Sequence, residues 1–273
     1  MRVIDAISEI LKKEGIDYLS CFPTTSIIEA AAEIGIRPII CRQERVGVGI
    51  ADGYSRITKG TPPGVFAMQY GPGAENAYPG VATAFADASP ILLLPLGHAR
   101  NRDRIFPHFS SVESFGSVTK YVEQINEVDT LGDTMRRAFQ RLKNGRPGPV
   151  MVEIPADIAE SDSSELIHQN YVPSSTYRSG ADENDVLKAA ELLLSSEFPV
   201  IYAGQGVIYG DACEELAELA ELTKIAVTTT MAGKGAIDEN QELALGISSV
   251  VMNGADLHYM QRSDTLLAVD TRL

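Results

Sequence analysis

The sequence predicts an α/β protein, with a doubly wound parallel six-stranded sheet followed by a second, incomplete Rossmann-like α/β unit. Short apolar, strand-like runs alternate with helix-like stretches, as expected for parallel strands joined by crossover helices. The same alternation resumes after a polar stretch in the middle of the chain. We therefore expect two domains with separate cores, for which 273 residues are sufficient.

Each strand expected in the first unit follows from a short apolar run. The runs are residues 18–22, 38–41, 64–69, 91–96, 117–122 and 149–154. An apolar stripe over residues 3–11 predicts an opening helix, and further helices are predicted over residues 26–34, 44–58, 74–85 and 126–142. Asn144-Gly145 is a stop signal for the last of them. The first domain is therefore expected to span residues 1–158.

Residues 159–181 are the expected linker, because they contain Ser, Asp, Pro and Gly but few large apolar side chains. The second unit is expected over residues 182–273. Its predicted elements are a helix at 182–195, a strand at 199–203, a helix at 211–222, and strands at 225–230 and 265–269. About three strands would leave a sheet edge open. We therefore expect this unit to be truncated and the chain to be a fragment.

Composition and charge narrow the classes of function. The net charge of −14 argues against a nucleic-acid or anionic-membrane surface and favours small organic ligands. The three cysteines, Cys21, Cys41 and Cys213, suggest neither a disulfide framework nor a metal site. The longest apolar run, residues 91–96, is far shorter than the roughly 20 residues of a membrane span. A soluble, cytoplasmic protein is expected.

Glu44 is the first candidate site residue. It follows the strand-like run 38–41 and begins a predicted helix. Ligands of open α/β sheets bind at the carboxyl ends of the strands, which places this carboxylate at an expected site. An acidic residue in the first turn of a helix is also favoured by the helix dipole alone. Position by itself leaves both readings open.

The turn Gly71-Pro72-Gly73, with Asn76 after it, is the second candidate. It joins a predicted strand to a predicted helix, and glycine there allows close approach of a ligand to the backbone while proline stiffens the turn. An ordinary strand-to-helix turn would have the same composition. The side-chain amide of Asn76 adds a polar group near this loop.

Two glycine spacings match a dinucleotide-binding pattern only weakly. The first, at positions 47, 49 and 53, lies inside a predicted helix, where small residues favour close packing. The second, at positions 204, 206 and 210, follows the predicted strand 199–203. The next strand, however, ends in Thr228-Thr229-Thr230 and offers no acid for a ribose hydroxyl. The spacings do not favour nicotinamide binding.

Taken together, these blocks resemble the thiamine diphosphate enzymes of the acetolactate synthase, benzoylformate decarboxylase and pyruvate oxidase group. The matching blocks are Arg42-Gln43-Glu44, residues 51–56, Gly71 to Asn76, residues 145–149 through Pro155-Ala156-Asp157, and residues 199–206 with 227–230. The resemblance covers nearly the whole chain. It implies a pyrimidine-binding domain over residues 1–158 and part of the central domain over residues 182–273.

The resemblance also implies a chemistry for the candidate residues. Glu44 matches the catalytic glutamate, which hydrogen-bonds to N1′ of the aminopyrimidine. Gly71, Pro72, Gly73 and Asn76 match positions that pack on or hydrogen-bond to that ring. The implied activity is decarboxylation of 2-keto acids with or without carboligation, as in acetolactate synthase. The alternatives are a benzoylformate decarboxylase-like lyase and a non-catalytic or partner-dependent subunit.

In that family a third domain holds the diphosphate through Mg²⁺ with a Gly-Asp-Gly motif and a later Asn. Neither this motif nor its metal ligands occur in the sequence. The family's active site lies between two subunits, so the resemblance implies a homodimer or homotetramer, or a partner chain that supplies the diphosphate side. The chain alone is expected to be inactive. Some relatives hold FAD against the central domain, which the sequence neither supports nor excludes.

The substrate side departs from the synthase pattern. Pro23 matches the proline of a Tyr-Pro-Gly-Gly loop beside the reacting centre, but Thr24 and Thr25 replace both glycines. Gln69 and Tyr70 stand where many relatives have Thr-Ser, and the benzoylformate-cleaving branch has a His near the first of these. We expect these five residues to face the substrate, and a keto acid or acceptor different from that of the synthases.

His98 and His108 are further candidates on that side. His98 replaces a frequent Gln after the strand 91–96, and His108 lies where synthases carry a Phe-Gln-Glu block. Either imidazole could orient a carboxylate or relay a proton, and either could serve only packing. The nearby Arg100, Arg102 and Arg104 fit a solvated loop or the recognition of an anionic substrate.

Overall fold

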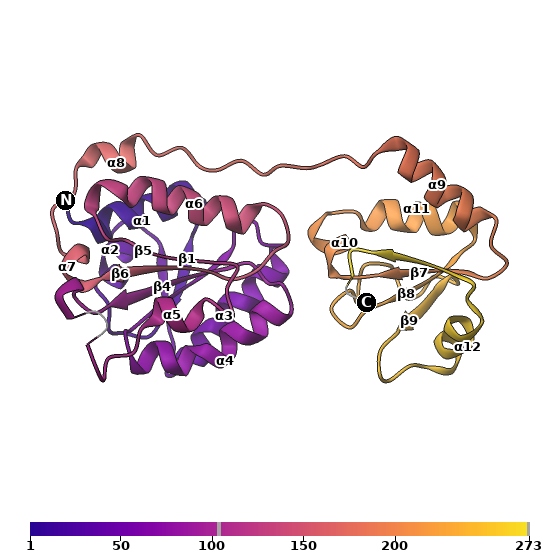
Figure 1. Cartoon of the computed structure of the whole chain (residues 1–273), viewed down its shortest axis with the longest axis horizontal. Helices are drawn as coiled ribbons and strands as arrows, with labels where there is room; N and C mark the ends of the chain where they lie inside the picture. The colour runs from indigo at the N-terminus through magenta and orange to yellow at the C-terminus, as the bar shows by residue number, and fades with distance from the viewer. Residues whose placement is uncertain (103–104, 272–273) are drawn as a thin grey trace. The chain divides into compact units, whose positions relative to one another are not determined.

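The computed structural model describes residues 1–102 and 105–271, and the chain divides into two compact units, Met1–Tyr177 and Arg178–Leu273 (Figure 1). In the described part of the first unit, six parallel strands form one sheet in the order β2-β1-β3-β4-β6-β5. The strands are β1 (Tyr18–Cys21), β2 (Arg37–Ile40), β3 (Gly64–Met68), β4 (Ile91–Gly97), β5 (Tyr121–Gln124) and β6 (Val150–Pro155). The predicted doubly wound parallel sheet is confirmed.

Helices cover both faces of this sheet (Figure 1). One face packs against α1 (Val3–Lys13), α2 (Ile27–Glu33) and α6 (Leu131–Lys143). The other packs against α3 (Glu44–Ile57), α4 (Pro72–Ala86) and α5 (Ser111–Phe115). Along β3, Val65 and Ala67 belong to the first core and Phe66 and Met68 to the second. Burial on both faces explains why the strands read as unbroken apolar runs rather than alternating ones.

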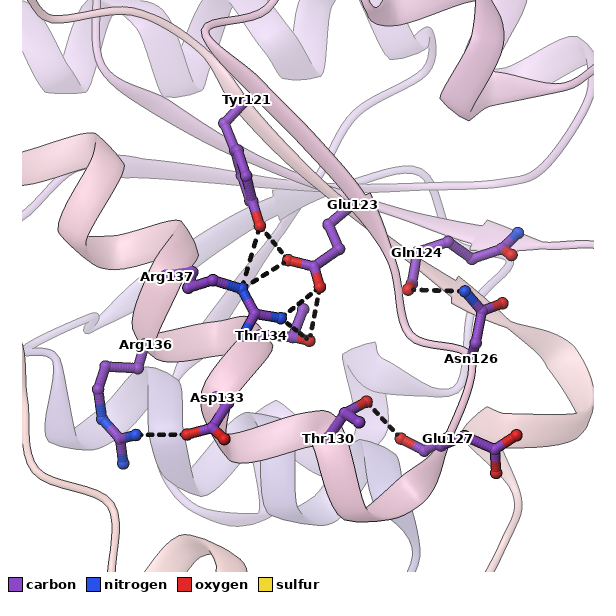
Figure 2. A network of polar contacts seen from close by, with 10 residues as sticks. All are labelled: Tyr121, Glu123, Gln124, Asn126, Glu127, Thr130, Asp133, Thr134, Arg136 and Arg137. Carbon is purple, nitrogen blue, oxygen red and sulfur yellow. Dashed lines mark hydrogen bonds and ion pairs between the residues drawn. The ribbon is translucent and has the colours of Figure 1, made fainter.

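The edge strand β5 differs from its prediction, which placed it at residues 117–122. It carries polar side chains that bond to α6 (Figure 2). Glu123 accepts hydrogen bonds from Arg137 and from Tyr121, and Thr134 Oγ1 donates to it at 3.2 Å. Burial raises the pKa of Glu123, but the hydrogen bonds from Arg137 and Tyr121 lower it by more than burial raises it. The net shift of the pKa is therefore downward. An apolar pattern does not reveal a strand held by such contacts.

The predicted helix 126–142 is also shorter at its start, because a 3₁₀ turn, η2 (Val128–Thr130), precedes α6. A second 3₁₀ turn, η1 (Arg100–Arg102), follows β4, and two short helices, α7 (Ala156–Ala159) and α8 (Glu165–Gln169), follow β6. None of these short elements is marked by apolar periodicity.

Much of the expected linker 159–181 is attached to the first unit. Tyr171 is only 3% exposed, and its hydroxyl donates to Glu14 Oε1 at 2.5 Å. Lys143 Nζ donates to Glu14 Oε2 at 2.5 Å and to the carbonyl of Ser174 at 3.0 Å. The segment is held by hydrogen bonds rather than by a run of large apolar side chains. Its composition therefore gave no sign of the attachment and suggested a free linker.

Over the described residues of the second unit, four parallel strands form a sheet in the order β10-β7-β8-β9. They are β7 (Pro199–Ala203), β8 (Ala226–Thr229), β9 (Ala244–Ile247) and β10 (Thr265–Val269). The helices are α9 (Glu183–Leu194), α10 (Gln205–Tyr209), α11 (Cys213–Thr223) and α12 (Gly254–Arg262). The short β9 was not predicted, and its pairing with β8 is shifted in register. No described helix is long and apolar enough to cross a bilayer.

Candidate functional site

Glu44 lies at the carboxyl edge of the first sheet. Strand β2 ends at Ile40, and α3 begins at Glu44. Between them, the backbone of Gln43 is extended, with φ −148° and ψ 142°. The residue is only 7% exposed. A carboxylate so little exposed, at the edge where ligands of open α/β sheets bind, has the placement expected of a functional group.

Glycines allow α3 to lie close against the sheet. A Cβ on Gly47 would come within 2.2 Å of the Phe66 ring and 2.9 Å of Cys41 Sγ. A Cβ on Gly64 would lie 2.0 Å from the carbonyl oxygen of Ala51. The glycine at position 47 therefore serves helix packing, as the sequence favoured. This close contact fixes where the first turn of α3 presents its carboxylate.

The Gly71-Pro72-Gly73 turn approaches Glu44 from β3. Gly71 has φ +54°, a conformation that favours glycine, and Pro72 is the first residue of α4. A Cβ on Gly73 would lie 2.8 Å from Gln69 Cβ and 3.2 Å from Glu44 Oε1. Any larger residue at position 73 would press on both side chains, so the glycine allows Gln69 and Glu44 to lie close against the turn.

Asn76, one turn further along α4, completes the group. Its Nδ2 donates to Glu44 Oε2 at 2.6 Å. The two helices are close because position 80 is glycine, where a Cβ would lie 3.0 Å from Val48 of α3. Residues predicted separately at 44, 73 and 76 are therefore in contact in the folded chain.

Three rings predicted for the substrate side are in contact, with His98 stacked on His108 and Tyr70 packed against His98 at a tilt of 48°. The ring centroids of Tyr70 and His98 are 4.5 Å apart, and those of His98 and His108 are 4.1 Å apart with an interplanar angle of 7°. His108 Nδ1 lies 3.2 Å from the carbonyl oxygen of Arg102. The stack joins the end of β3 to the loop after β4, because these parallel strands are neighbours and end at the same edge.

The other substrate-side candidates follow β1. Pro23 and Thr24 are exposed, whereas Thr25 is 8% exposed. Its Oγ1 is buried and has no hydrogen-bond partner among the residues that the structure describes. β1 and β3 are adjacent and parallel, so the loop 22–26 and Gln69 lie at the same edge of the sheet. Among the described residues, no hydrogen bond joins Thr25 directly to Glu44.

The three arginines near His108 do not share one environment. Arg100 pairs with Asp157 at 2.8 Å, and its Nη1 donates to the carbonyl of Asn126 at 2.6 Å. These contacts connect the loop after β4 to the ends of neighbouring segments, which is a structural role. Arg102 is exposed, and Arg104 lies outside the described residues.

The sequence did not single out two buried groups at this edge, the Glu153 carboxylate and the Cys41 thiol. Gln124 donates to Glu153 Oε1 at 2.6 Å, and the absence of a side chain at Gly97 makes room for Glu153. Cys41 was considered only for disulfides and metals, yet burial and, less strongly, the Glu44 carboxylate raise the pKa of its thiol. Its position three residues before Glu44 was the available signal. In the described residues no cluster of His, Cys, Asp and Glu is suited to a metal ion.

The glycine turn of the second unit is filled by the chain itself. A Cβ on Gly204 would lie 2.2 Å from the carbonyl oxygen of Asp270, and one on Gly206 would lie 2.3 Å from Asp270 Cβ. Asp270 follows β10, which neighbours β7. The two glycines thus allow the chain at Asp270 to lie against this turn.

Sequence comparison identifies both units. Residues 1–123 match the model of the thiamine pyrophosphate enzyme N-terminal TPP binding domain, and residues 186–273 match that of the thiamine pyrophosphate enzyme central domain. The chain belongs to the thiamine diphosphate enzyme family. The predicted resemblance is confirmed, and Glu44, Gly73 and Asn76 all lie in the matched N-terminal region.

The relatives of this chain within the thiamine diphosphate enzyme family include synthases and a carboligase. A probable acetolactate synthase large subunit of Methanocaldococcus jannaschii is 33% identical over 284 residues, covering 100% of this chain and 47% of the relative. A glyoxylate carboligase of Escherichia coli O157:H7 is 32% identical, covering 99% and 45%. An acetolactate synthase large subunit of Parasynechococcus marenigrum is 30% identical, covering 98% and 45%. The chain spans about half the length of these curated relatives.

Proposed function

We propose that this chain supplies the aminopyrimidine half of the active site in a thiamine diphosphate-dependent enzyme acting on 2-keto acids. The reaction is decarboxylation with or without carboligation, in the manner of acetolactate synthase. The observation that carries the proposal is the buried Glu44 carboxylate, held by Asn76 beside the glycine turn at Gly73. Relatives named as acetolactate synthases and a glyoxylate carboligase support the reaction class.

The residues at this turn fit an aminopyrimidine. No described atom lies within 4 Å of a Cβ placed on Gly71, so the backbone of the turn is uncovered there, and Pro72 stiffens it. Glu44 offers a carboxylate oxygen to the protonated ring nitrogen N1′, and its burial keeps water from competing for that contact. When bound, thiamine diphosphate supplies an electron sink for the electron pair released as a 2-keto acid loses carbon dioxide.

Glu44 is the proposed catalytic residue. Its carboxyl group exchanges a proton with N1′ and thereby sets the protonation of the ring. Gly71, Pro72, Gly73 and Asn76 are the proposed cofactor-binding residues, because they form the turn and the first part of α4 around Glu44. Each of these residues comes from the sheet edge where ligands of open α/β folds bind.

The proposed substrate side is built from the loop after β1, the end of β3 and the ring stack. It comprises Pro23, Thr24, Thr25, Gln69, Tyr70, His98 and His108. The ring stack brings two imidazoles to the end of β3, beside the Gln69-Tyr70 pair that replaces Thr-Ser. These groups favour a keto acid or acceptor that differs from that of the acetolactate synthases.

The diphosphate and its Mg²⁺ are proposed to be held by polypeptide outside residues 1–273. This polypeptide would come from a second copy of a longer gene product in a homodimer or homotetramer, or from a partner chain. We propose domain limits at 1–158 and 182–273, with residues 159–181 between them. FAD is not proposed, because no observation on the described residues supports it. The cytoplasmic location stays a prediction from the sequence.

The first experiment is calorimetric titration of thiamine diphosphate with Mg²⁺ into the purified chain and into the longer gene product, if the reading frame continues. We expect the longer form to bind and to decarboxylate members of a 2-keto acid panel. Glu44→Gln is expected to lower that rate by about 100-fold or more. Glu33→Gln, an exposed acid at the end of α2, is the matched control and should leave the rate unchanged.

Product analysis then separates the alternatives. An aldehyde as sole product would favour a benzoylformate decarboxylase-like lyase, whereas an acyloin product would favour a carboligase. Binding that needs a co-purifying second polypeptide would identify a partner-dependent subunit. Absence of cofactor binding in both forms would contradict the enzyme proposal and favour a non-catalytic role.

A further inference from the structure

The two oxygens of the Glu44 carboxylate have different surroundings. Oε2 accepts the hydrogen bond from Asn76 Nδ2 at 2.6 Å. Oε1 lies toward Gly73, 3.2 Å from where a Cβ would be at that position. One oxygen is therefore committed to a side chain of α4, while the other lies beside Gly73.

We propose that Asn76 is a positioning residue that acts through Glu44, and that it fixes the rotation of the carboxylate so that Oε1 is presented to N1′ of the aminopyrimidine. The inference rests on the proposed function and deepens it. It assigns Asn76 to the orientation of the glutamate, whereas the sequence resemblance assigned it only to the surroundings of the ring. Glu44 remains the catalytic residue.

The contact has the properties that orientation requires. Its acceptor is a carboxylate of low exposure, and hydrogen bonds to ionised acceptors are shorter and stronger than those between neutral groups. Without a partner, the terminal torsion of a glutamate is broad, so the carboxylate would sample many rotations. A bond to one oxygen selects one rotation and leaves the other oxygen free to accept.

The backbone on both sides of the contact is fixed by packing. Glu44 begins α3, which lies tightly on β3 because Gly47 has no side chain beside Phe66. Asn76 lies in the second turn of α4, which approaches α3 where Gly80 lies against Val48. Asn76 has only a short side chain to order, so little conformational freedom is lost in holding the amide at Glu44.

The residue type matters as well as the position. An amide nitrogen can donate to the carboxylate without adding charge. Aspartate at position 76 would place two carboxylates at a hydrogen-bonding distance, and alanine would remove the donor. Glutamine keeps the amide but adds one methylene, which the exposed position of residue 76 can accommodate.

The test compares Asn76→Ala, Asn76→Asp and Asn76→Gln in the form of the protein that binds the cofactor. The first readout is the rate of deuterium exchange at C2 of bound thiamine diphosphate, measured by quenched NMR. The others are the calorimetric Kd for thiamine diphosphate with Mg²⁺ and the melting temperature without cofactor. Asn184→Ala, which removes an exposed amide on α9, is the matched control.

We expect Asn76→Ala to slow exchange by about tenfold or more, because small misplacements of a catalytic group cost up to about 100-fold. The Kd and the melting temperature should change little by comparison. Asn76→Asp should slow exchange at least as much, Asn76→Gln should recover part of the rate, and Asn184→Ala should match the native protein. In a Glu44→Gln background, Asn76→Ala should add nothing.

Each contrary result has a definite meaning. Normal exchange in Asn76→Ala, with exchange abolished in Glu44→Gln, would overturn the role of Asn76 and leave the proposed function intact. A fall in exchange matched by an equal loss of cofactor affinity or of thermal stability would also overturn it, in favour of a structural role. Normal exchange in Glu44→Gln, or no cofactor binding by any form, would refute the proposed function and this inference with it.

Discussion

Two glycine turns with similar sequences have different roles in the two units. Gly71-Pro72-Gly73 follows β3 and opens α4, and Gly204-Gln205-Gly206 follows β7 and opens α10. In the first turn, the space above Gly73 is bounded by the side chains of Gln69 and Glu44. In the second, the space above both glycines is occupied by the backbone and side chain of Asp270.

The comparison shows that a glycine after a parallel strand records only a close approach, not the identity of the group that approaches. Beside Gly73 the approaching groups are the side chains of Gln69 and Glu44, and one of the approaching atoms is a carboxylate oxygen. Beside β10 the approaching group is the protein's own chain, paired through Gly204 N–H to the carbonyl of Val269 at 2.9 Å. Three substitutions can test this difference.

Gly204→Ala should have the largest effect on stability. The new Cβ would meet backbone atoms of Asp270 at 2.2 Å and 2.7 Å, and these cannot move without disturbing the β7–β10 pairing. We expect a loss of about 3 kcal/mol in the free energy of unfolding of the second unit. Urea unfolding measures it, with Gly254→Ala as control because no described atom lies within 4 Å of that Cβ. Equal stability of the two variants would contradict the packing role of Gly204.

Gly206→Ala should cost somewhat less, about 2 kcal/mol, because its Cβ would overlap side-chain atoms of Asp270 rather than backbone. Asp270→Gly in the same chain should recover most of this loss, since it removes those atoms and suits the positive φ of 45° at position 270. A double-mutant cycle from urea unfolding gives the coupling. Additive effects would show that Asp270 is not what occupies the second turn.

Gly73→Ala should have the smallest effect on stability and a clear effect on binding. The new Cβ would lie 2.8 Å from Gln69 Cβ and 3.2 Å from Glu44 Oε1, so both side chains must shift. We expect about 1 kcal/mol of destabilisation and a Kd for thiamine diphosphate at least about tenfold weaker, which corresponds to about 1.4 kcal/mol. Gly49→Ala, an open helical position, is the control and should be neutral or slightly stabilising. An unchanged Kd would mean that the first turn is a packing feature like the second.

Prediction succeeded where local pattern carries the information. The buried strands of the first sheet were found to within a residue or so, and β7 matched its predicted residues, because a buried parallel strand must be apolar on both faces. The edge strand β10 also matched, because residues 266–269 are an unbroken apolar run although the strand is only partly buried. The polar edge strand β5 was misplaced and β9 was missed. The polar side chains of β5 and a glycine with φ +98° in β9 break the apolar pattern.

Within the candidate site, the residue types could be recognised without the folded structure. The sequence supplied a carboxylate at a helix start, a glycine-proline-glycine turn after a strand, and an amide one turn later, and the match to the thiamine diphosphate family followed from their order. The folded chain was needed to show that Asn76 donates to Glu44, that Tyr70 packs against His98, which stacks on His108, and that Asp270 lies in the second turn. These contacts join segments from different crossovers. Their distances depend on how closely helices pack on the sheet and on one another, which local periodicity does not encode.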